Sequence, residues 1–128
     1  MGSTSFVVVG GTSGIGLEIT RRLAAENFRV VVVSRSAGSV ADLSGVTHLQ
    51  ADITRDEIDA GSFPDRIQGL VYCPGSIQLR PFHRLKEDDF LADLQINFLG
   101  AVKAIQACLP GLRKADNPSS IVLFSTVA

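Results

Sequence analysis

The stretch Val7-Val8-Val9-Gly10-Gly11-Thr12-Ser13-Gly14-Ile15-Gly16 decides the fold. An apolar run typical of a buried strand enters a glycine-rich turn, and a helical pattern begins directly behind it. Backbone N–H groups at the start of a helix point outward unpaired, and the helix dipole favours negative charge there. The glycine spacing G-x-x-x-G-x-G differs from G-x-G-x-x-G but meets the same needs: a tight turn, close backbone approach and close helix–strand packing. The stretch therefore predicts a phosphate-binding loop.

Strand and helix patterns alternate behind this loop. The sequence predicts strands at residues 6–9, 29–33, 46–50, 67–73 and 120–125. It predicts helices at residues 14–27 and from 86 or 87 to about 112, with shorter helical segments at 39–43 and 55–60. Pro110 is expected to kink or end the long helix. This alternation indicates a single α/β domain over residues 1–128, with a parallel sheet and right-handed crossovers.

The composition excludes several classes of function. The chain has 128 residues, 45% hydrophobic residues and a net charge of −1, so it lacks the basic footprint of a nucleic-acid or anionic-membrane binder. No apolar run approaches the roughly 18 residues of a membrane span. Cys73 and Cys108 form no metal-type spacing. We therefore expect a cytoplasmic, reduced protein without a metal site, nucleic-acid partner or membrane.

Several polar residues are candidates for ligand contacts. Thr12 and Ser13 can hydrogen-bond phosphate or ribose, or can cap the helix that follows. Arg35 comes 19 residues after Gly16, where NAD-preferring folds carry an acid for the ribose 2′-hydroxyl. Because a guanidinium pairs well with a 2′-phosphate, this residue favours NADP over NAD. The alternative is a solvated surface arginine.

Other candidates lie at strand ends and within the long helix. Asp52 follows the third strand and is a candidate ligand contact or the N-cap of a short helix. Asn97 lies among apolar neighbours, where an amide is costly unless paired, so it has a bridging role or is a satisfied core amide. Thr126 stands at the carboxyl end of a strand, where open α/β sheets place ligands, or is an ordinary strand-end residue. Cys73 is interpreted as a small core residue rather than a nucleophile, since no histidine neighbours it in sequence.

These motifs together resemble the short-chain dehydrogenase/reductase family, in its classical rather than its extended form. Gly10 to Gly16 is similar to the family's cofactor loop T-G-x-x-x-G-x-G, with Val9 at the threonine position. The resemblance implies a Rossmann-type three-layer α/β/α fold with strand order 3-2-1-4-5, lacking the last two family strands. The implied NADP-binding residues, with NAD also possible, are Gly10, Thr12, Ser13, Gly14, Ile15, Gly16, Ser34, Arg35, Asp52, Ile53, Cys73, Pro74 and Gly75.

The resemblance also implies catalytic positions. Asn97 looks like the family's helix asparagine, which holds a proton-relay water. Thr126 aligns with the catalytic hydroxyl, with Ser125 one place before it. The implied reaction is hydride transfer between nicotinamide C4 and a carbonyl or alcohol carbon of a small molecule, with a Tyr supplying the proton and a Lys lowering its pKa.

The family's Y-x-x-x-K pattern is missing from these 128 residues. Tyr72 is the only tyrosine, and Ser76 stands four residues later. We therefore expect the cofactor half of such an oxidoreductase, inactive alone. The alternative is a non-catalytic dinucleotide-binding module; an extended-type epimerase is disfavoured because its loop is usually G-x-x-G-x-x-G. We also expect a homo-oligomer, and self-association through an exposed apolar edge at Ile121 to Phe124.

Overall fold

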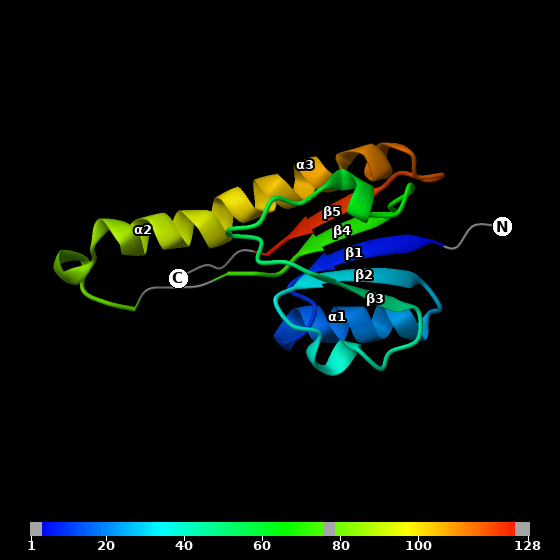
Figure 1. Ribbon diagram of the computed structural model, residues 1–128, viewed down its shortest axis with the longest axis horizontal. Coiled ribbons are helices and arrows are strands. Elements are labelled where there is room, and N and C mark those ends of the chain that lie inside the picture. The colour runs from blue at the N-terminus through cyan, green and yellow to red at the C-terminus, as the bar shows by residue number, and fades with distance from the viewer. Residues whose placement is uncertain (1–3, 76–78, 125–128) are drawn as a thin grey trace.

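A computed structural model describes residues 4–75 and 79–124, where strands and helices alternate (Figure 1). The strands are β1 (Ser5–Val9), β2 (Arg29–Ser34), β3 (Val46–Gln50), β4 (Gly69–Tyr72) and β5 (Ser120–Leu123). The main helices are α1 (Gly14–Ala25), α2 (Glu87–Leu94) and α3 (Gly100–Arg113), with a π-helical segment η4 (Gln95–Leu99) joining the last two. Short 3-10 turns are η1 (Gly38–Val40), η2 (Ala60–Ser62) and η3 (Phe82–Arg84).

The strands of this described part form one parallel sheet in the order β3-β2-β1-β4-β5, which confirms the predicted order. Central β1 pairs with β2 on one side and with β4 on the other; Val7 lies opposite Val31 and Leu70. The chain therefore adds β2 and then β3 on one side of β1, and β4 and then β5 on the other side. Ligands of open α/β sheets bind beyond the carboxyl ends of the strands at such a reversal.

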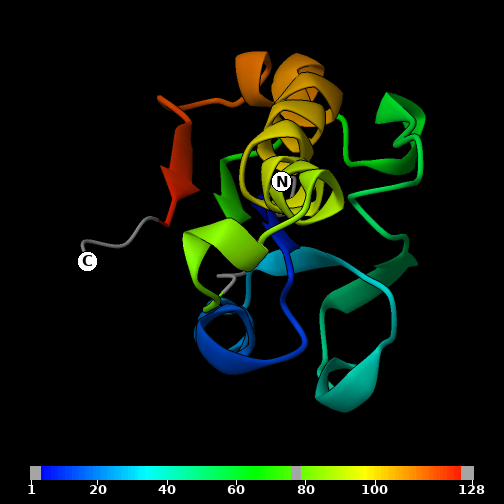
Figure 2. The same cartoon turned by 90° about the vertical axis from the view of Figure 1, so that its left-hand side faces the viewer.

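Successive valines of β1 and β2 point to opposite faces of the sheet, where they form two hydrophobic cores. Both strands are almost entirely buried and β-branched, as expected where helices cover a parallel sheet on both sides. Val8 and Val32 face the layer that contains α1, and Val7 and Val33 face α3. Figures 1 and 2 show α1 below the sheet and α3 above it, with α2 extending past the sheet's edge.

Helix α1 ends in a Schellman motif. The N–H of Phe28 donates to the carbonyl of Leu23 at 3.1 Å, and the N–H of Asn27 donates to Ala24 at 3.0 Å. Asn27 has a φ of 65°, and asparagine tolerates this left-handed conformation better than most residues. The predicted stop at Asn27 is confirmed.

The long helix differs from its prediction because a π-helical segment interrupts it at Gln95–Leu99. The hydroxyl of Tyr72, at the end of β4, donates a hydrogen bond to the carbonyl of Ile96 within this segment. A π turn closes hydrogen bonds over five residues instead of four, and such bulges often occur at functional sites. Pro110 does not end α3, which continues to Arg113. Proline removes one backbone hydrogen bond from the helix, and the burial of Cys108 and Leu112 in the core compensates for that loss.

The predicted helix at residues 55–60 is absent from the described structure. Asp52 and Asp59 instead accept hydrogen bonds from N–H groups two residues ahead, in Thr54 and Gly61. Such local side-chain bonds compete with helix formation. A turn follows Asp52, and only the 3-10 turn η2 forms later.

Candidate functional site

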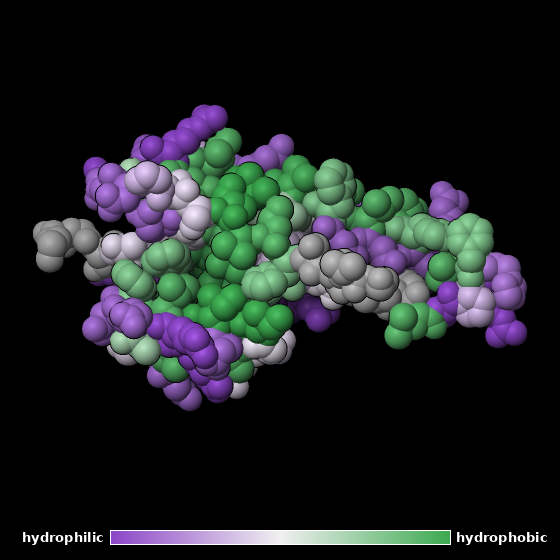
Figure 3. Space-filling view, turned by 180° about the vertical axis from the view of Figure 1, so that it is seen from behind, coloured by the Kyte–Doolittle hydropathy of each residue, from purple (hydrophilic) through white to green (hydrophobic). Residues whose placement is uncertain are grey.

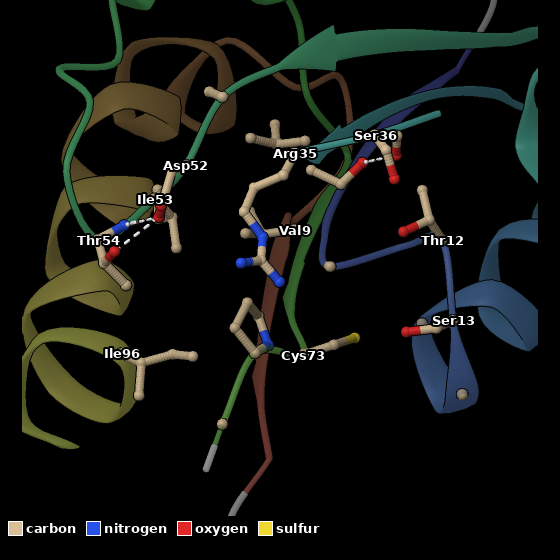
Figure 4. A pocket seen from close by; sticks show the side chains of 18 of the residues that line it. Val9, Thr12, Ser13, Arg35, Ser36, Asp52, Ile53, Thr54, Cys73 and Ile96 are labelled. Atoms are coloured by element: carbon tan, nitrogen blue, oxygen red, sulfur yellow. Dashed lines mark hydrogen bonds between the residues drawn. The ribbon is translucent and has the colours of Figure 1, made fainter. Parts of the chain in front are cut away.

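A pocket of about 540 Å³ opens beyond the carboxyl ends of β1, β2, β3 and β4 (Figure 4). It lies where the order of the strands reverses, the usual place for a ligand in an open α/β sheet. All thirteen predicted cofactor residues line it, although they come from four separate stretches of the chain. Lining residues that sequence reasoning did not include are Val9, Val33, Ser36, Ala51, Thr54 and Ile96.

The glycine loop takes a conformation that larger residues would disrupt. Gly10 has a φ of +79°, and its N–H donates to the carbonyl of Val33 at 2.8 Å, which joins the loop to β2. A Cβ on Gly16 would lie 2.2 Å from the carbonyl oxygen of Gly10, so the first turn of α1 packs directly on the turn behind β1. Both glycines are therefore required by backbone geometry.

The N-terminus of α1 faces the pocket. The first α-helical hydrogen bond runs from the N–H of Leu17 to the carbonyl of Ser13 at 3.1 Å. The N–H groups of Gly14, Ile15 and Gly16 precede that bond, as expected for a helix start. Within the described residues, the Ser13 side chain makes no capping hydrogen bond, which disfavours the predicted capping role for this residue. These donors and the helix dipole form an anion-binding surface.

Arg35 reaches into the same pocket from the end of β2. Figure 4 shows its guanidinium between the wall that carries Asp52 and Ile53 and the wall that carries Thr12. The side chain is exposed, and its charge contributes to lowering the pKa of Asp52. A guanidinium beside a helix N-terminus makes the pocket suitable for a ligand with more than one anionic group.

Asp52 organises the wall opposite the glycine loop. Its Oδ1 accepts from the N–H of Thr54 at 2.9 Å and from the Thr54 hydroxyl at 2.6 Å. These bonds from Thr54 are the main cause of the lowered pKa of Asp52. Lys103 of α3 holds the same segment in place, because its ammonium group donates hydrogen bonds to the carbonyls of Ile53, at 3.5 Å, and Asp56, at 3.2 Å. The carboxylate is therefore ionised and held in place, and the turn uses one of its two oxygens.

The floor of the pocket follows β4. Cys73 is half-buried, and burial raises the pKa of its thiol to about 11. This agrees with its interpretation as a core residue, because a nucleophilic cysteine needs a lowered pKa. Gly75 adjoins η4: a Cβ there would lie 3.1 Å from Oδ1 of Asn97.

Asn97 does not occupy the environment that the sequence suggested. Its side chain is exposed in the described structure and belongs to the π-helical segment. An exposed amide bears no burial cost, so burial does not demand a bridging partner for it. Ser125 and Thr126 lie outside the described residues.

Tyr72 is buried, and its hydroxyl is hydrogen-bonded within the protein. It is 3% exposed, its hydroxyl donates to the carbonyl of Ile96, and burial raises its pKa to about 12. A phenol in this state is a poor proton donor to a ligand. Tyr72 is therefore a packing residue at the base of the site.

Comparison with known proteins identifies the family. A model of the short chain dehydrogenase family matches residues 4–128. The chain belongs to the short-chain dehydrogenase family, which confirms the resemblance in the sequence, and members of this family are NAD(P)-binding oxidoreductases.

Individual relatives show how much of such a protein this chain spans. It is 30% identical over 118 residues to the 3-oxoacyl-[acyl-carrier-protein] reductase MabA of Mycobacterium avium, covering 88% of this chain and 45% of that protein. It is 26% identical over 134 residues to the 3-dehydrosphinganine reductase TSC10A of Arabidopsis thaliana, covering 94% and 41%. A solved 3-oxoacyl-[acyl-carrier protein] reductase from Brucella melitensis superposes with a TM-score of 0.82 and 27% identity, over 98% of this chain and 58% of that structure. The chain thus spans less than half the length of both sequence relatives.

Among the described residues, no helix is both long and apolar enough to cross a bilayer.

Proposed function

We propose that this chain binds NADP and belongs to an oxidoreductase that interconverts a small-molecule carbonyl and the corresponding alcohol. The observation that carries the proposal is the meeting of the Arg35 guanidinium and the N-terminus of α1 in one pocket. NADP has a pyrophosphate and a separate 2′-phosphate, so it needs two anion sites. The donor set of the pocket fits that need.

The glycine loop is assigned to the pyrophosphate. The N–H groups of Gly14, Ile15 and Gly16 supply hydrogen-bond donors at the positive end of the helix. Apart from the residues next to it in the chain and the backbone of its own helix, no described atom lies within 4 Å of the position that a Cβ on Gly14 would take, so this side of the loop is open. Thr12 and Ser13 add hydroxyl donors from the same turn.

Arg35 is assigned to the 2′-phosphate, and Asp52 to the adenine. A guanidinium offers two parallel donors to phosphate oxygens, which gives geometric selectivity as well as charge. Ionised Asp52 accepts from an amino group, and buried Ile53 offers an apolar wall beside it. Lys103 keeps this wall in place through two main-chain carbonyls.

The bound cofactor supplies hydride chemistry in this family, and the residues described here hold it. Both sequence relatives named above are reductases, which favours the direction from carbonyl to alcohol. Asn97 lies beside Gly75 at the pocket floor and is assigned a positioning role for water, while Thr126 and Ser125 are assigned the substrate hydroxyl contact. Tyr72 is excluded as the proton donor by its bond to Ile96.

Calorimetric titration of NADPH and NADH into wild type and Arg35→Ala tests the cofactor assignment. A charge-assisted hydrogen bond contributes about 1.5–3 kcal/mol, so Arg35→Ala should weaken NADPH binding roughly 10- to 150-fold and leave NADH binding almost unchanged. Arg55→Ala is the matched control, because Arg55 is also exposed and acts on Asp52 without lining the pocket. An unchanged preference for NADPH in Arg35→Ala would overturn the assignment.

A second candidate function is dinucleotide binding without chemistry. The observation that favours it is the commitment of Tyr72, the only tyrosine among these 128 residues, to a main-chain carbonyl. The two candidates share the pocket and differ in whether a Tyr follows Thr126 by about 12–14 positions with a Lys four later. Sequencing the gene beyond the codon for Ala128 distinguishes them directly.

A further inference from the structure

A hydrogen-bonded cluster lies behind the Arg35 side of the pocket. Nε2 of His48, on β3, lies 2.8 Å from the hydroxyl oxygen of Ser34 and 3.2 Å from the Ser34 carbonyl oxygen. The Ser34 hydroxyl in turn donates to the carbonyl of Ser36 at 2.7 Å. His48 itself does not line the pocket.

The direction of each bond in the cluster follows from counting hydrogens. A serine hydroxyl has one hydrogen, and Ser34 gives it to the Ser36 carbonyl. His48 must then donate to the Ser34 oxygen, and the Ser34 carbonyl, which only accepts, also requires a hydrogen on Nε2. The imidazole therefore carries its hydrogen on Nε2. The Nε2–H of His48, on β3, therefore donates to both the hydroxyl oxygen and the carbonyl oxygen of Ser34.

Two residues of this cluster, Ser34 and Ser36, flank Arg35 in the sequence. The bond between Ser34 and Ser36 spans Arg35, so it fixes the backbone on both sides of that residue. His48 fixes Ser34 from the neighbouring strand, and the sheet register makes the two diagonal neighbours, with Val32 opposite His48 and Ser34 opposite Gln50. A long side chain such as arginine binds more tightly when its base is fixed, because less conformational freedom is lost on binding.

We infer that His48 is a positioning residue for 2′-phosphate selectivity, acting through Ser34 to hold Arg35 toward the pocket. This inference rests on the proposed NADP function. It assigns to His48 no contact with the ligand. Removal of the His48 N–H should weaken the binding of the ligand with a 2′-phosphate and spare the ligand without one.

Titration of NADPH and NADH into three variants tests the inference. His48→Leu removes the donor, and we expect the Kd for NADPH to rise about five- to tenfold while the Kd for NADH changes less than about twofold. His48→Gln restores an N–H at similar reach, and we expect both Kd values within about twofold of wild type. Ser34→Ala should raise the Kd for NADPH at least as much as His48→Leu does, and adding His48→Leu to Ser34→Ala should raise it no further, because His48 acts through Ser34. Thermal unfolding of each variant checks that it folds.

The outcomes separate this inference from the proposed function. Equal weakening of NADPH and NADH in His48→Leu, or no change in their ratio, overturns the role of His48. If Arg35→Ala removes the preference for NADPH over NADH while His48→Leu keeps it, the role of His48 is wrong and the proposed function stands. If wild type shows no preference for NADPH, both proposals fail. Ser34→Ala and His48→Gln keep the test decisive should His48→Leu not fold.

Discussion

The hydroxyl of Tyr72 donates a hydrogen bond to the carbonyl of Ile96, and this contact joins the end of β4 to the π-helical segment between α2 and α3. Space for the phenol comes from Gly100, where a Cβ would lie only 2.2 Å from the Tyr72 oxygen. Gly100 is buried at the start of α3. The tyrosine, the glycine and the wide helical turn therefore form one unit beside the pocket.

This unit predicts strong coupling between Tyr72 and Gly100. Gly100→Ala should destabilise the fold by about 2–3 kcal/mol through overpacking, and Tyr72→Phe by about 1 kcal/mol through the lost hydrogen bond. In the double variant the clashing oxygen is gone and the nearest ring atom lies 3.3 Å away, so the cost of Gly100→Ala should fall by about half or more. Urea denaturation of the four proteins measures the cycle.

Gly111→Ala combined with Tyr72→Phe is the control for this cycle. Gly111 lies in the same helix, but its Cβ would meet Ile67 rather than Tyr72, so the two changes should add. Additive costs for Tyr72→Phe and Gly100→Ala would contradict the packing described here.

Gly16 and Gly14 should differ in what an alanine costs. At Gly16 the added Cβ meets main-chain atoms of Gly10 that cannot move aside, so Gly16→Ala should cost about 2–3 kcal/mol of stability and abolish NADPH binding. At Gly14 the φ of +54° disfavours alanine by about 1–2 kcal/mol, with no clash against any described atom. Denaturant unfolding compares them, and a larger loss for Gly14→Ala than for Gly16→Ala would show that the loop packs differently.

Cys73 should react slowly with alkylating reagents. Burial raises the pKa of its thiol from 9.0 to about 11, so at pH 8 its thiolate fraction is about a hundredfold below that of an unperturbed thiol. Higher intrinsic nucleophilicity offsets part of this, and we expect iodoacetamide to react about tenfold more slowly than with a free thiol. The rate should rise with pH between 7 and 9 and fall when NADPH fills the pocket.

Cys73→Ser provides the background for that experiment, since it leaves only Cys108, which is fully buried. A rate for Cys73 equal to or above that of a free thiol would indicate a lowered pKa, and Cys73 would then be a candidate nucleophile.

The edge strand β5 predicts self-association of the 128-residue chain. Ile121, Val122, Leu123 and Phe124 are each 43–53% exposed, and within the described residues β5 pairs with β4 alone. Figure 3 shows an extended apolar surface on the face opposite that of Figure 1. An apolar strand at the edge of a sheet invites pairing with a second copy.

Val122→Lys should shift the chain toward monomer in light-scattering chromatography, because a charge on an edge strand opposes pairing. Phe90→Lys, at the same 43% exposure on α2, is the matched control and should not. A sharp monomer peak for wild type would contradict the prediction.

The parallel sheet and the pocket walls could be predicted from local patterns, whereas the strand order was implied by the resemblance to the family. Runs of valine, a glycine turn and a polar residue after each strand suffice to place residues such as Arg35 and Asp52 at one edge of a parallel sheet. The π-helical segment was not predictable in this way, since it is contacted by the hydroxyl of Tyr72, twenty-four residues before Ile96. The helix expected at residues 55–60 failed because aspartate side chains bonded to nearby N–H groups. The role of His48 could not be predicted, since nothing in the sequence joins it to Ser34, fourteen residues away.

We propose that one pocket holds NADP through the glycine loop, the Arg35 turn and the Asp52 wall. Titration of ¹⁵N-labelled protein with NADPH, followed by amide chemical shifts, tests it most directly. The account predicts the largest shifts at Thr12 to Gly16, at Ser34 to Ser36 and at Asp52 to Thr54, with the second group unmoved by NADH. Shifts confined to other parts of the chain, or none at saturating NADPH, would contradict it.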